Sequence, residues 1–208
     1  MAARSRSARA GLLTELVEFD RRVSGGGAAV LAGVDEAGRG ALAGPVVAAA
    51  VICDHCGELD GVRDSKLISE SRREALYEII LKKSAAWSTG TVWPEEIDRI
   101  NILNATLKAM KIAVESLPVK ADLVIVDGRK VPDIDIPASP FTGGDGRSFC
   151  IAAASIVAKV FRDRIMRELC GRYRGYSFRR NKGYGTGEHK AAIRRLGITE
   201  IHRKSFRH

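Results

Sequence analysis

The chain alternates between short apolar runs and longer segments with helical periodicity. Residues 28–34 and 46–53 are almost entirely small or β-branched, which is typical of strands buried on both faces of a sheet. Gly38, Gly40 and Gly44 lie between these two runs. Because glycines favour tight turns, this stretch predicts two strands that fold back on each other.

The rest of the chain carries signals for helices and two further strands. Alternation around residues 87–93 indicates a half-exposed strand, and residues 123–126 indicate a short buried one. Three of the six prolines fall in residues 130–140, which predicts a loop. Pro94 is well placed to open a helix. Apolar spacing and capping residues predict helices at 11–22, 69–83, 101–117, 148–170 and 188–196. Strands mixed with helices in this way predict an α/β fold with a mixed β-sheet flanked by helices.

Bulk composition narrows the class of protein. With 208 residues, 45% of them apolar and 28% charged, the chain has the composition of an ordinary globular domain. No apolar run reaches the ~18 residues of a membrane span. The basic start of the chain has no apolar segment of a secretory signal behind it. We therefore expect a cytoplasmic protein with no membrane association and reduced cysteines.

The net charge of +9 is distributed unevenly. Residues 1–170 contain equal numbers of basic and acidic residues, whereas residues 171–208 contain 11 Lys or Arg and two acids, which accounts for the whole excess. Such an asymmetry favours a polyanionic partner, most simply a nucleic acid backbone. The alternative is a solvated basic helix that only aids solubility.

Three parts follow from these patterns. Residues 1–27 are expected to form a flexible N-terminal tail with a short helix, and residues 28–170 the main α/β domain. Residues 171–208 are expected to form a basic helical C-terminal extension packed on the same domain.

Carboxylates stand at the ends of predicted strands and near a helix start. Asp35 and Glu36 follow the first apolar run, Asp127 ends the 123–126 strand, and Asp145 precedes the longest helix. Each has an ordinary alternative as a solvated turn residue or a helix-capping acid. If their strands are neighbours, however, four carboxylates meet and need cations, and hard oxygen ligands suit Mg²⁺ or Mn²⁺. One or two such ions can activate water for phosphodiester hydrolysis.

Other chemistries have weaker support. Cys53 and Cys56 have the C-x-x-C spacing of zinc or redox motifs, but Cys150 and Cys170 stand alone, so no second pair completes a site. The four histidines are scattered, and neither a phosphate-binding loop nor a serine nucleophile elbow is present.

The chain resembles bacterial ribonuclease HII, a type 2 ribonuclease H, over about residues 30–206. The resemblance begins with Asp35-Glu36-Ala37-Gly38-Arg39-Gly40. Further matches follow in order at Asp64-Ser65-Lys66, Asn101-Ile102-Leu103, Val126-Asp127-Gly128, Ala153-Ala154-Ser155-Ile156, Lys182-Gly183-Tyr184 and His202-Arg203-Lys204-Ser205-Phe206.

The resemblance implies a ribonuclease H-like fold with a helical C-terminal extension and a specific activity. It implies cleavage of the RNA strand of RNA–DNA hybrids. It also implies nicking of DNA on the 5′ side of embedded ribonucleotides, leaving a 3′-hydroxyl and a 5′-phosphate. Roles in ribonucleotide and RNA-primer removal follow, with a monomer as the expected state. Carried over to this chain, the catalytic and metal-binding carboxylates are Asp35, Glu36, Asp127 and Asp145.

The resemblance also implies substrate-binding residues. The backbone of Gly38-Arg39-Gly40 would approach the ribose and read its 2′-hydroxyl, and glycine permits that close approach. Tyr184 would pack against the sugar that follows the ribonucleotide, although an aromatic with its hydroxyl in water is the simpler interpretation without the resemblance. Lys66, Lys182 and the basic C-terminal segment would hold phosphates.

Three positions depart from the usual family pattern. Gly143 stands where a lysine is usual, Asn181 where a histidine is frequent, and Ala152 where a serine is frequent. None of them removes a carboxylate, so we expect effects on turnover or ion preference rather than on reaction type. Two alternatives stay open: a hybrid-binding module without catalysis, and a metal-dependent nuclease with another substrate.

Overall fold

A five-stranded mixed sheet forms the centre of the computed structural model, which describes residues 2–53, 59, 61–62 and 68–207, with the backbone alone for residues 2–12. The strands are β1 Leu31–Ala37, β2 Val46–Ile52, β3 Ala86–Val92, β4 Leu123–Asp127 and β5 Ala138–Phe141. Their order is β3-β2-β1-β4-β5. β1, β2 and β3 pair antiparallel, and β4 lies parallel to both β1 and β5. The predicted hairpin and mixed α/β fold are confirmed.

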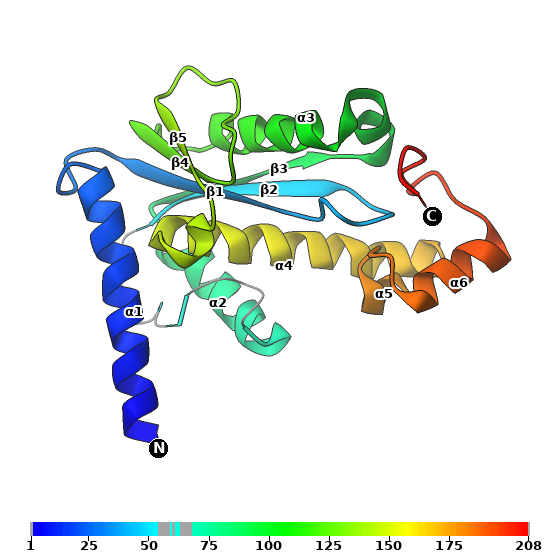
Figure 1. The fold of residues 1–208 in the computed structure, drawn as a ribbon, viewed down its shortest axis with the longest axis horizontal. Helices are drawn as coiled ribbons and strands as arrows, with labels where there is room; N and C mark the ends of the chain where they lie inside the picture. Colours follow the sequence, from blue (N-terminus) through cyan, green and yellow to red (C-terminus); the bar gives the residue numbers. More distant parts are fainter. Residues whose placement is uncertain (1, 54–58, 60, 63–67, 208) are drawn as a thin grey trace.

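Helices cover both faces of this sheet (Figure 1). They are α1 Ala2–Val23, α2 Glu70–Lys83, α3 Pro94–Glu115, α4 Phe149–Arg172, α5 Phe178–Asn181 and α6 Gly187–Leu196, with a short 3-10 turn, η3, at Gly144–Gly146. α3 lies on one face, and α4 with α2 on the other. α1 lies near the start of α4, whereas α5 and α6 lie near its end.

Alternating residues of β2 explain why its sequence is apolar throughout. Ala49 and Val51 pack in the core under α2 and α4, whereas Ala48 and Ala50 pack in the core under α3. α4 approaches β1 so closely that a Cβ on Gly33 would lie 2.2 Å from the carbonyl carbon of Cys150. Small residues therefore set the spacing between the sheet and its longest helix.

Several elements differ from the sequence prediction. The predicted loop at residues 130–140 is wrong at its end, because Ala138–Phe141 forms the edge strand β5 despite Pro140. A proline is tolerated there because an edge strand leaves one side unpaired. The helix predicted at 101–117 is the second part of α3, which starts at Pro94 and is interrupted at Asn101. The Asn101 side chain accepts hydrogen bonds from the backbone of Leu103 and Asn104, and so caps this second part.

The last segment of the chain is tied back to α3. Asp98 accepts hydrogen bonds from the backbone N–H groups of Lys204 at 2.8 Å and Ser205 at 2.9 Å. α1 extends from Ala2 to Val23, well beyond the predicted helix at 11–22. The division into a tail, a main domain and an extension stays a prediction. Within the described part of the chain, no helix is long and apolar enough to span a membrane.

Asp20 joins α1 to the start of α4. Its carboxylate accepts a hydrogen bond of 2.8 Å from the backbone N–H of Cys150, in the first turn of α4, while Ser148 caps the same helix through Ile151. Burial raises the pKa of Asp20. The carboxylate thus acts as a second cap, supplied by a helix 130 residues earlier in the chain.

Replacing Asp20 by Ala is expected to lower the free energy of unfolding by about 1–2 kcal/mol, the usual effect of losing a helix cap. Asp20→Asn should lower the free energy of unfolding by less, because its amide oxygen can still accept a hydrogen bond from the backbone N–H of Cys150. Urea denaturation measures both, with Glu18→Ala on the exposed side of α1 as the control. Equal stabilities for Asp20→Ala and Glu18→Ala would contradict the capping role.

Candidate active site

Strand pairing brings two of the predicted carboxylates together. β1 and β4 are parallel neighbours, and Val34 pairs with Val126. The next residue on each strand is Asp35 and Asp127, respectively, so the two carboxylates lie at the same edge of the sheet. Asp127 accepts a hydrogen bond of 2.8 Å from the backbone N–H of Gly144, which fixes the loop that follows β5.

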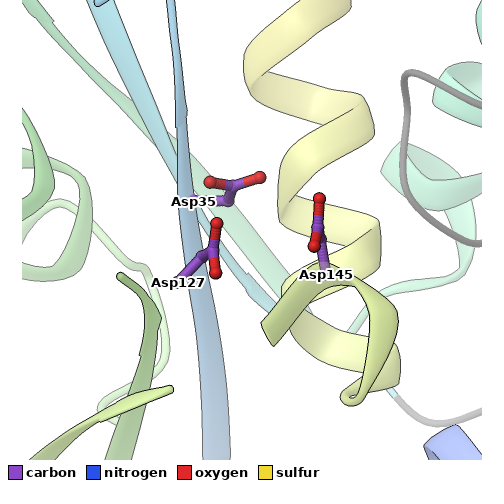
Figure 2. Close-up of side chains that lie close together, drawn as sticks. All are labelled: Asp35, Asp127 and Asp145. Carbon is purple, nitrogen blue, oxygen red and sulfur yellow. The ribbon is translucent and has the colours of Figure 1, made fainter. Parts of the chain in front are cut away.

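Asp145 completes a cluster of three carboxylates. It lies in η3, directly before α4, and its side chain points toward the two strand residues (Figure 2). One oxygen from each of Asp35, Asp127 and Asp145 lies within 4.8 Å of the others. Asp35 and Asp145 are buried, with 5% and 7% of their surface exposed. Such a set of hard oxygen ligands is compatible with a metal ion.

The electrostatics of the cluster are unfavourable for three anions alone. Burial raises the pKa of Asp35 well above its ordinary value, and the charges of Glu36 and Asp127 raise it further. Hydrogen bonds from the backbone N–H of Glu36, at 2.7 Å, and from Ser155 on α4 oppose that shift only in part. A cation between the carboxylates would relieve this repulsion, so the donor set fits a divalent metal.

Glu36 lies beside the cluster without joining it in this structure. Successive residues of a strand point to opposite faces, so its side chain diverges from that of Asp35. One carboxylate oxygen lies 3.3 Å from the guanidinium of Arg39, which is half exposed. The structure therefore brings together three of the four predicted carboxylates and places the fourth next to them.

Two buried arginines hold the predicted substrate loop at Gly38-Arg39-Gly40. Arg203 donates to the carbonyls of Gly38 and Arg39, each at 2.8 Å, and to that of Gly44. Arg162 lies against Gly38, where an added Cβ would be 2.0 Å from its Nε atom. Both arginines are fully buried. Burial and the neighbouring Arg162 charge lower the pKa of Arg203 to about 9.

Tyr184 lies beside the segment that follows this loop. The backbone N–H groups of Leu42 and Ala43 both donate to the carbonyl of Gly183, and Tyr184 itself bridges to Ala41. The Tyr184 ring lies 5.2 Å from the guanidinium carbon of Arg162, which also donates to the carbonyl of Lys182 at 2.9 Å. The predicted substrate residues at 38–40 and 184 therefore share one arginine scaffold.

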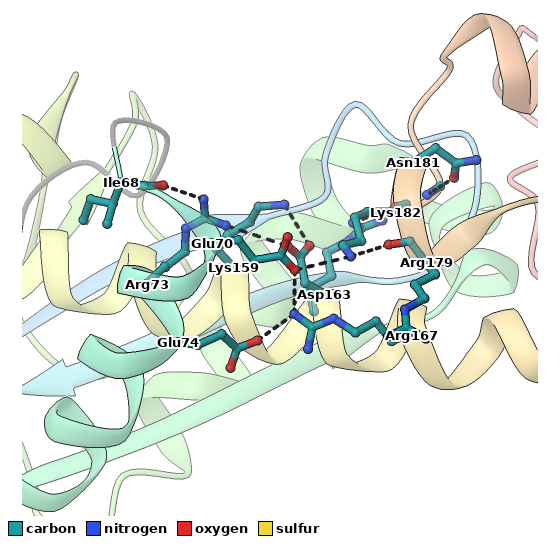
Figure 3. Close-up of polar contacts among 12 residues, drawn as sticks. Ile68, Glu70, Arg73, Glu74, Lys159, Asp163, Arg167, Arg179, Asn181 and Lys182 are labelled. Carbon is teal, nitrogen blue, oxygen red and sulfur yellow. Dashed lines mark hydrogen bonds and ion pairs between the residues drawn. The ribbon is translucent and has the colours of Figure 1, made fainter.

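Lys182 is turned away from solvent in a charged network between α2, α4 and α5 (Figure 3). Its ammonium group donates to the carbonyl of Arg179 and lies 3.8 Å from the carboxylate of Glu70. Burial lowers its pKa, and the charges of Asp163 and Glu70 oppose that shift. A phosphate contact from Lys182 would therefore compete with these partners. Lys66 and Cys56 lie outside the described residues, and Cys53 is buried.

Asn181 has a structural explanation at the position where a histidine is frequent in the family pattern. Its amide donates to the carbonyl of Tyr176 at 2.7 Å and accepts from the backbone N–H of Gly183 at 2.8 Å. The side chain is buried and closes the turn that presents Tyr184. Asn181 therefore supports the loop in this chain.

Comparison with known proteins decides the family. A family model described as ribonuclease HII matches residues 32–208. The chain belongs to the ribonuclease HII family. It is therefore a ribonuclease H, a hydrolase of the nuclease class, and the family and enzyme class predicted from the sequence are confirmed.

Relatives and solved structures of this family cover most of the chain. Ribonuclease HII of Acetivibrio thermocellus is 49% identical over 192 residues, covering 92% of this chain and 75% of the relative. That of Moorella thermoacetica is 48% identical over 193 residues, covering 93% and 94%. The ribonuclease H2 structure from Pyrococcus horikoshii has a TM-score of 0.71 at 27% identity, covering 85% of this chain and 93% of the other. The ribonuclease HII in the PCNA complex from Archaeoglobus fulgidus has a TM-score of 0.72 at 27% identity, covering 86% and 95%.

Proposed function

We propose that this ribonuclease cleaves the RNA strand of RNA–DNA hybrids and nicks DNA on the 5′ side of embedded ribonucleotides. The products would be a 3′-hydroxyl and a 5′-phosphate. The observation that carries this proposal is the convergence of Asp35, Asp127 and Asp145 within 4.8 Å at one edge of the sheet. Hydrolysis of a phosphodiester needs charge stabilisation at such a point, and acids alone would repel the substrate.

The metal would be Mg²⁺ or Mn²⁺, with two ions during catalysis. Asp35, Asp127 and Asp145 would hold it, with Glu36 as a fourth carboxylate beside them. When bound, such ions neutralise the carboxylates and supply a water of lowered pKa. The chain itself contributes orientation: the Gly144 N–H fixes Asp127, and the Ser155 hydroxyl with the Glu36 N–H fixes Asp35.

Substrate recognition would fall to the loop held by Arg162 and Arg203. The backbone of Gly38-Arg39-Gly40 would read the ribose 2′-hydroxyl, and Tyr184 would pack on the sugar that follows it. Lys182 and Lys66 would contact phosphates, as would the basic residues among 171–208. The enzyme would act as a monomer. We assign the enzyme to ribonucleotide and RNA-primer removal in the cytoplasm.

The decisive experiment uses a labelled DNA duplex with one ribonucleotide, incubated with the protein and Mg²⁺ or Mn²⁺. Controls contain EDTA or an all-DNA duplex. We expect a metal-dependent nick on the 5′ side of the ribonucleotide that both controls lack. Salt-sensitive binding without any cut would instead support the hybrid-binding module, and cleavage of all-DNA duplex would support another substrate class.

Replacing Tyr184 by Ala should reduce nicking at a single ribonucleotide by about tenfold or more, as expected from losing ~1–3 kcal/mol of aromatic packing on a nucleotide. Binding to the duplex should fall much less, because phosphate contacts dominate affinity. Tyr184→Phe keeps the ring and should stay near the wild-type rate. Equal losses of nicking and binding in Tyr184→Ala would mean that the ring only supports the fold.

A further inference from the structure

A pair of buried histidines contacts the backbone carbonyl of Tyr184. The Nε2 atoms of His189 and His202 are 3.2 Å apart, and the two residues are 0% and 1% exposed. His189 comes from α6, and His202 from the segment that returns toward the sheet, where it bridges to Ala43. The pair therefore joins the C-terminal segment to Tyr184 and Ala43.

The partners of the two rings fix where each proton lies. The Nδ1 atom of His189 is 3.0 Å from the carbonyl oxygen of Tyr184, which can only accept, so His189 carries its proton on Nδ1. The Nδ1 atom of His202 accepts from the backbone N–H of Thr199 at 2.9 Å, so it carries a lone pair, to which the Thr199 hydroxyl, also 2.9 Å away, can donate as well. A neutral His202 then carries its proton on Nε2 and donates it to the Nε2 atom of His189.

These contacts form one directed chain of hydrogen bonds. It runs from the Thr199 N–H through His202 and His189 to the Tyr184 carbonyl, and every member has the donor or acceptor that its neighbour needs. A second proton on either ring would place two donors face to face, either at the Nε2 atoms or at the Thr199 N–H. All of these hydrogen bonds are therefore made when both histidines are neutral and each has one defined tautomer.

Aromatic side chains complete the surroundings of the pair. The ring centroid of Phe178 is 5.3 Å from that of His189, and the ring centroid of Tyr176 is 5.1 Å from that of His202. Tyr176 and Phe178 stack on each other with an interplanar angle of 8°. The rings leave each imidazole little freedom to rotate, so a lost hydrogen bond cannot be replaced by a simple flip.

We propose that His189 and His202 are positioning residues that set the place of Tyr184 relative to the substrate. The Tyr184 N–H donates to the carbonyl of Asn181 at 2.9 Å, so His189 supplies the hydrogen bond on the other side of the same residue. The Tyr184 carbonyl also accepts from the backbone N–H of Thr186 at 2.8 Å, so loss of His189 removes one of its two donors and loosens the position of the ring between Lys159 and Arg162. This inference rests on the proposed contact between Tyr184 and the nucleotide sugar.

The tautomers can be tested on the wild-type protein, without any activity. Long-range ¹H–¹⁵N correlation spectra distinguish protonated from unprotonated imidazole nitrogens. At neutral pH we expect His189 protonated on Nδ1 only and His202 on Nε2 only. His189→Asn and His202→Asn assign the signals. A charged ring, or the opposite tautomer on either residue, would overturn the proposal whether or not the enzyme nicks DNA.

A double-mutant cycle tests the action on Tyr184. His189→Leu should reduce nicking at a single ribonucleotide by about tenfold, as Tyr184→Ala does, and the double variant should be no slower than Tyr184→Ala alone. His189→Asn, which keeps a donor near the Nδ1 position, should recover most of the rate. Ala191→Ser on the exposed side of α6 is the control. If the rate losses of the two single variants multiply in the double variant, the histidine pair acts on stability rather than through Tyr184.

Two failures can be told apart. If the wild-type enzyme does not nick the ribonucleotide substrate, the proposed function is wrong, while the tautomer spectra still report on the histidine chain. If the enzyme nicks and the spectra agree, but His189→Leu keeps the wild-type rate while folded, the positioning role is wrong. His189→Asn protects the test against a variant that does not fold.

Discussion

Replacing Asp127 by Asn should reduce cleavage by about 1,000-fold or more, because a metal site contributes several kcal/mol of transition-state stabilisation and each ~1.4 kcal/mol is tenfold in rate. The substitution keeps an oxygen that can accept from the Gly144 N–H, so the loop before η3 should keep its place. Asp35→Asn should behave in the same way, because its backbone hydrogen bond from Glu36 also survives. Cleavage of the single-ribonucleotide duplex in Mg²⁺ measures both.

A matched control is available on the loop that follows β4. Asp133 has a fully exposed side chain, so Asp133→Asn removes the same charge away from the cluster. It should cleave at the wild-type rate. Circular dichroism and a thermal melt show that each variant is folded. Near-normal activity in folded Asp35→Asn or Asp127→Asn would contradict the assignment of these carboxylates to a metal site.

Asp35→Asn should be more stable than the wild type when metal is removed. The pKa of Asp35 is raised in the folded state, chiefly by burial, so its ionised form opposes folding at neutral pH. Below its ordinary value of 3.8 the carboxyl is protonated in both states and this unfavourable contribution vanishes. Asp35→Asn should therefore melt above the wild type in EDTA at about pH 8, and the difference should shrink toward about pH 4.

Added Mg²⁺ should reverse that order. A ligand that binds only the folded state raises its stability by mass action. The ion should therefore raise the melting temperature of the wild type and raise that of Asp35→Asn much less. Thermal melts with and without Mg²⁺ report this without any nucleic acid. Equal shifts in the wild type and Asp35→Asn would mean that the ion binds elsewhere.

The sequence predicted the central strands because their signal is local. β2 throughout, and β1 up to Asp35, are buried on both faces, so their residues are apolar and mostly small or β-branched, and the glycines between the strands define the turn. β5 was missed for the opposite reason. It has four residues, one of them proline, and its pairing with β4 depends on a neighbour that local periodicity cannot reveal. The helix predicted from Asn101 does begin there, at the break within α3.

The carboxylates could be proposed from the sequence because each stands at the end of a recognisable element. That Asp35, Asp127 and Asp145 converge required the parallel register of β1 and β4, which sequence spacing does not give. Arg162 was missed as part of the loop scaffold. The sequence did contain a signal for it. Arg162 is a charged residue on an apolar stripe of α4, because the residues one turn before and after it, Ala158 and Met166, are both buried.

Arg203 could not be found in this way, because it lies in an irregular segment where burial follows no period. Its guanidinium gathers the carbonyls of Gly38, Arg39 and Gly44, which are more than 150 residues away in the sequence. The residue belongs to a stretch that resembles the family, but the resemblance alone gave it no role. The structure shows that its contacts join the end of the chain to the loop beside the carboxylates.

Arg203→Met is therefore expected to lower the free energy of unfolding by about 3–5 kcal/mol, because it leaves several buried carbonyls without donors at roughly 1–3 kcal/mol each. Arg203→Lys should recover only part of the loss, since one ammonium cannot reach three carbonyls held by a planar fork. Denaturant unfolding measures both, and Arg207→Met, an exposed arginine four residues later, is the control.

Catalysis should fail in Arg203→Met even where the protein is folded, because the Gly38 and Arg39 carbonyls lose the group that holds the loop in place. The test is cleavage well below the melting temperature, with binding to the duplex measured in parallel. We expect nicking at an embedded ribonucleotide to fall much more than binding. If Arg203→Met unfolds and cleaves like Arg207→Met, the carbonyls find other partners, and Arg162 alone holds the loop against the sheet.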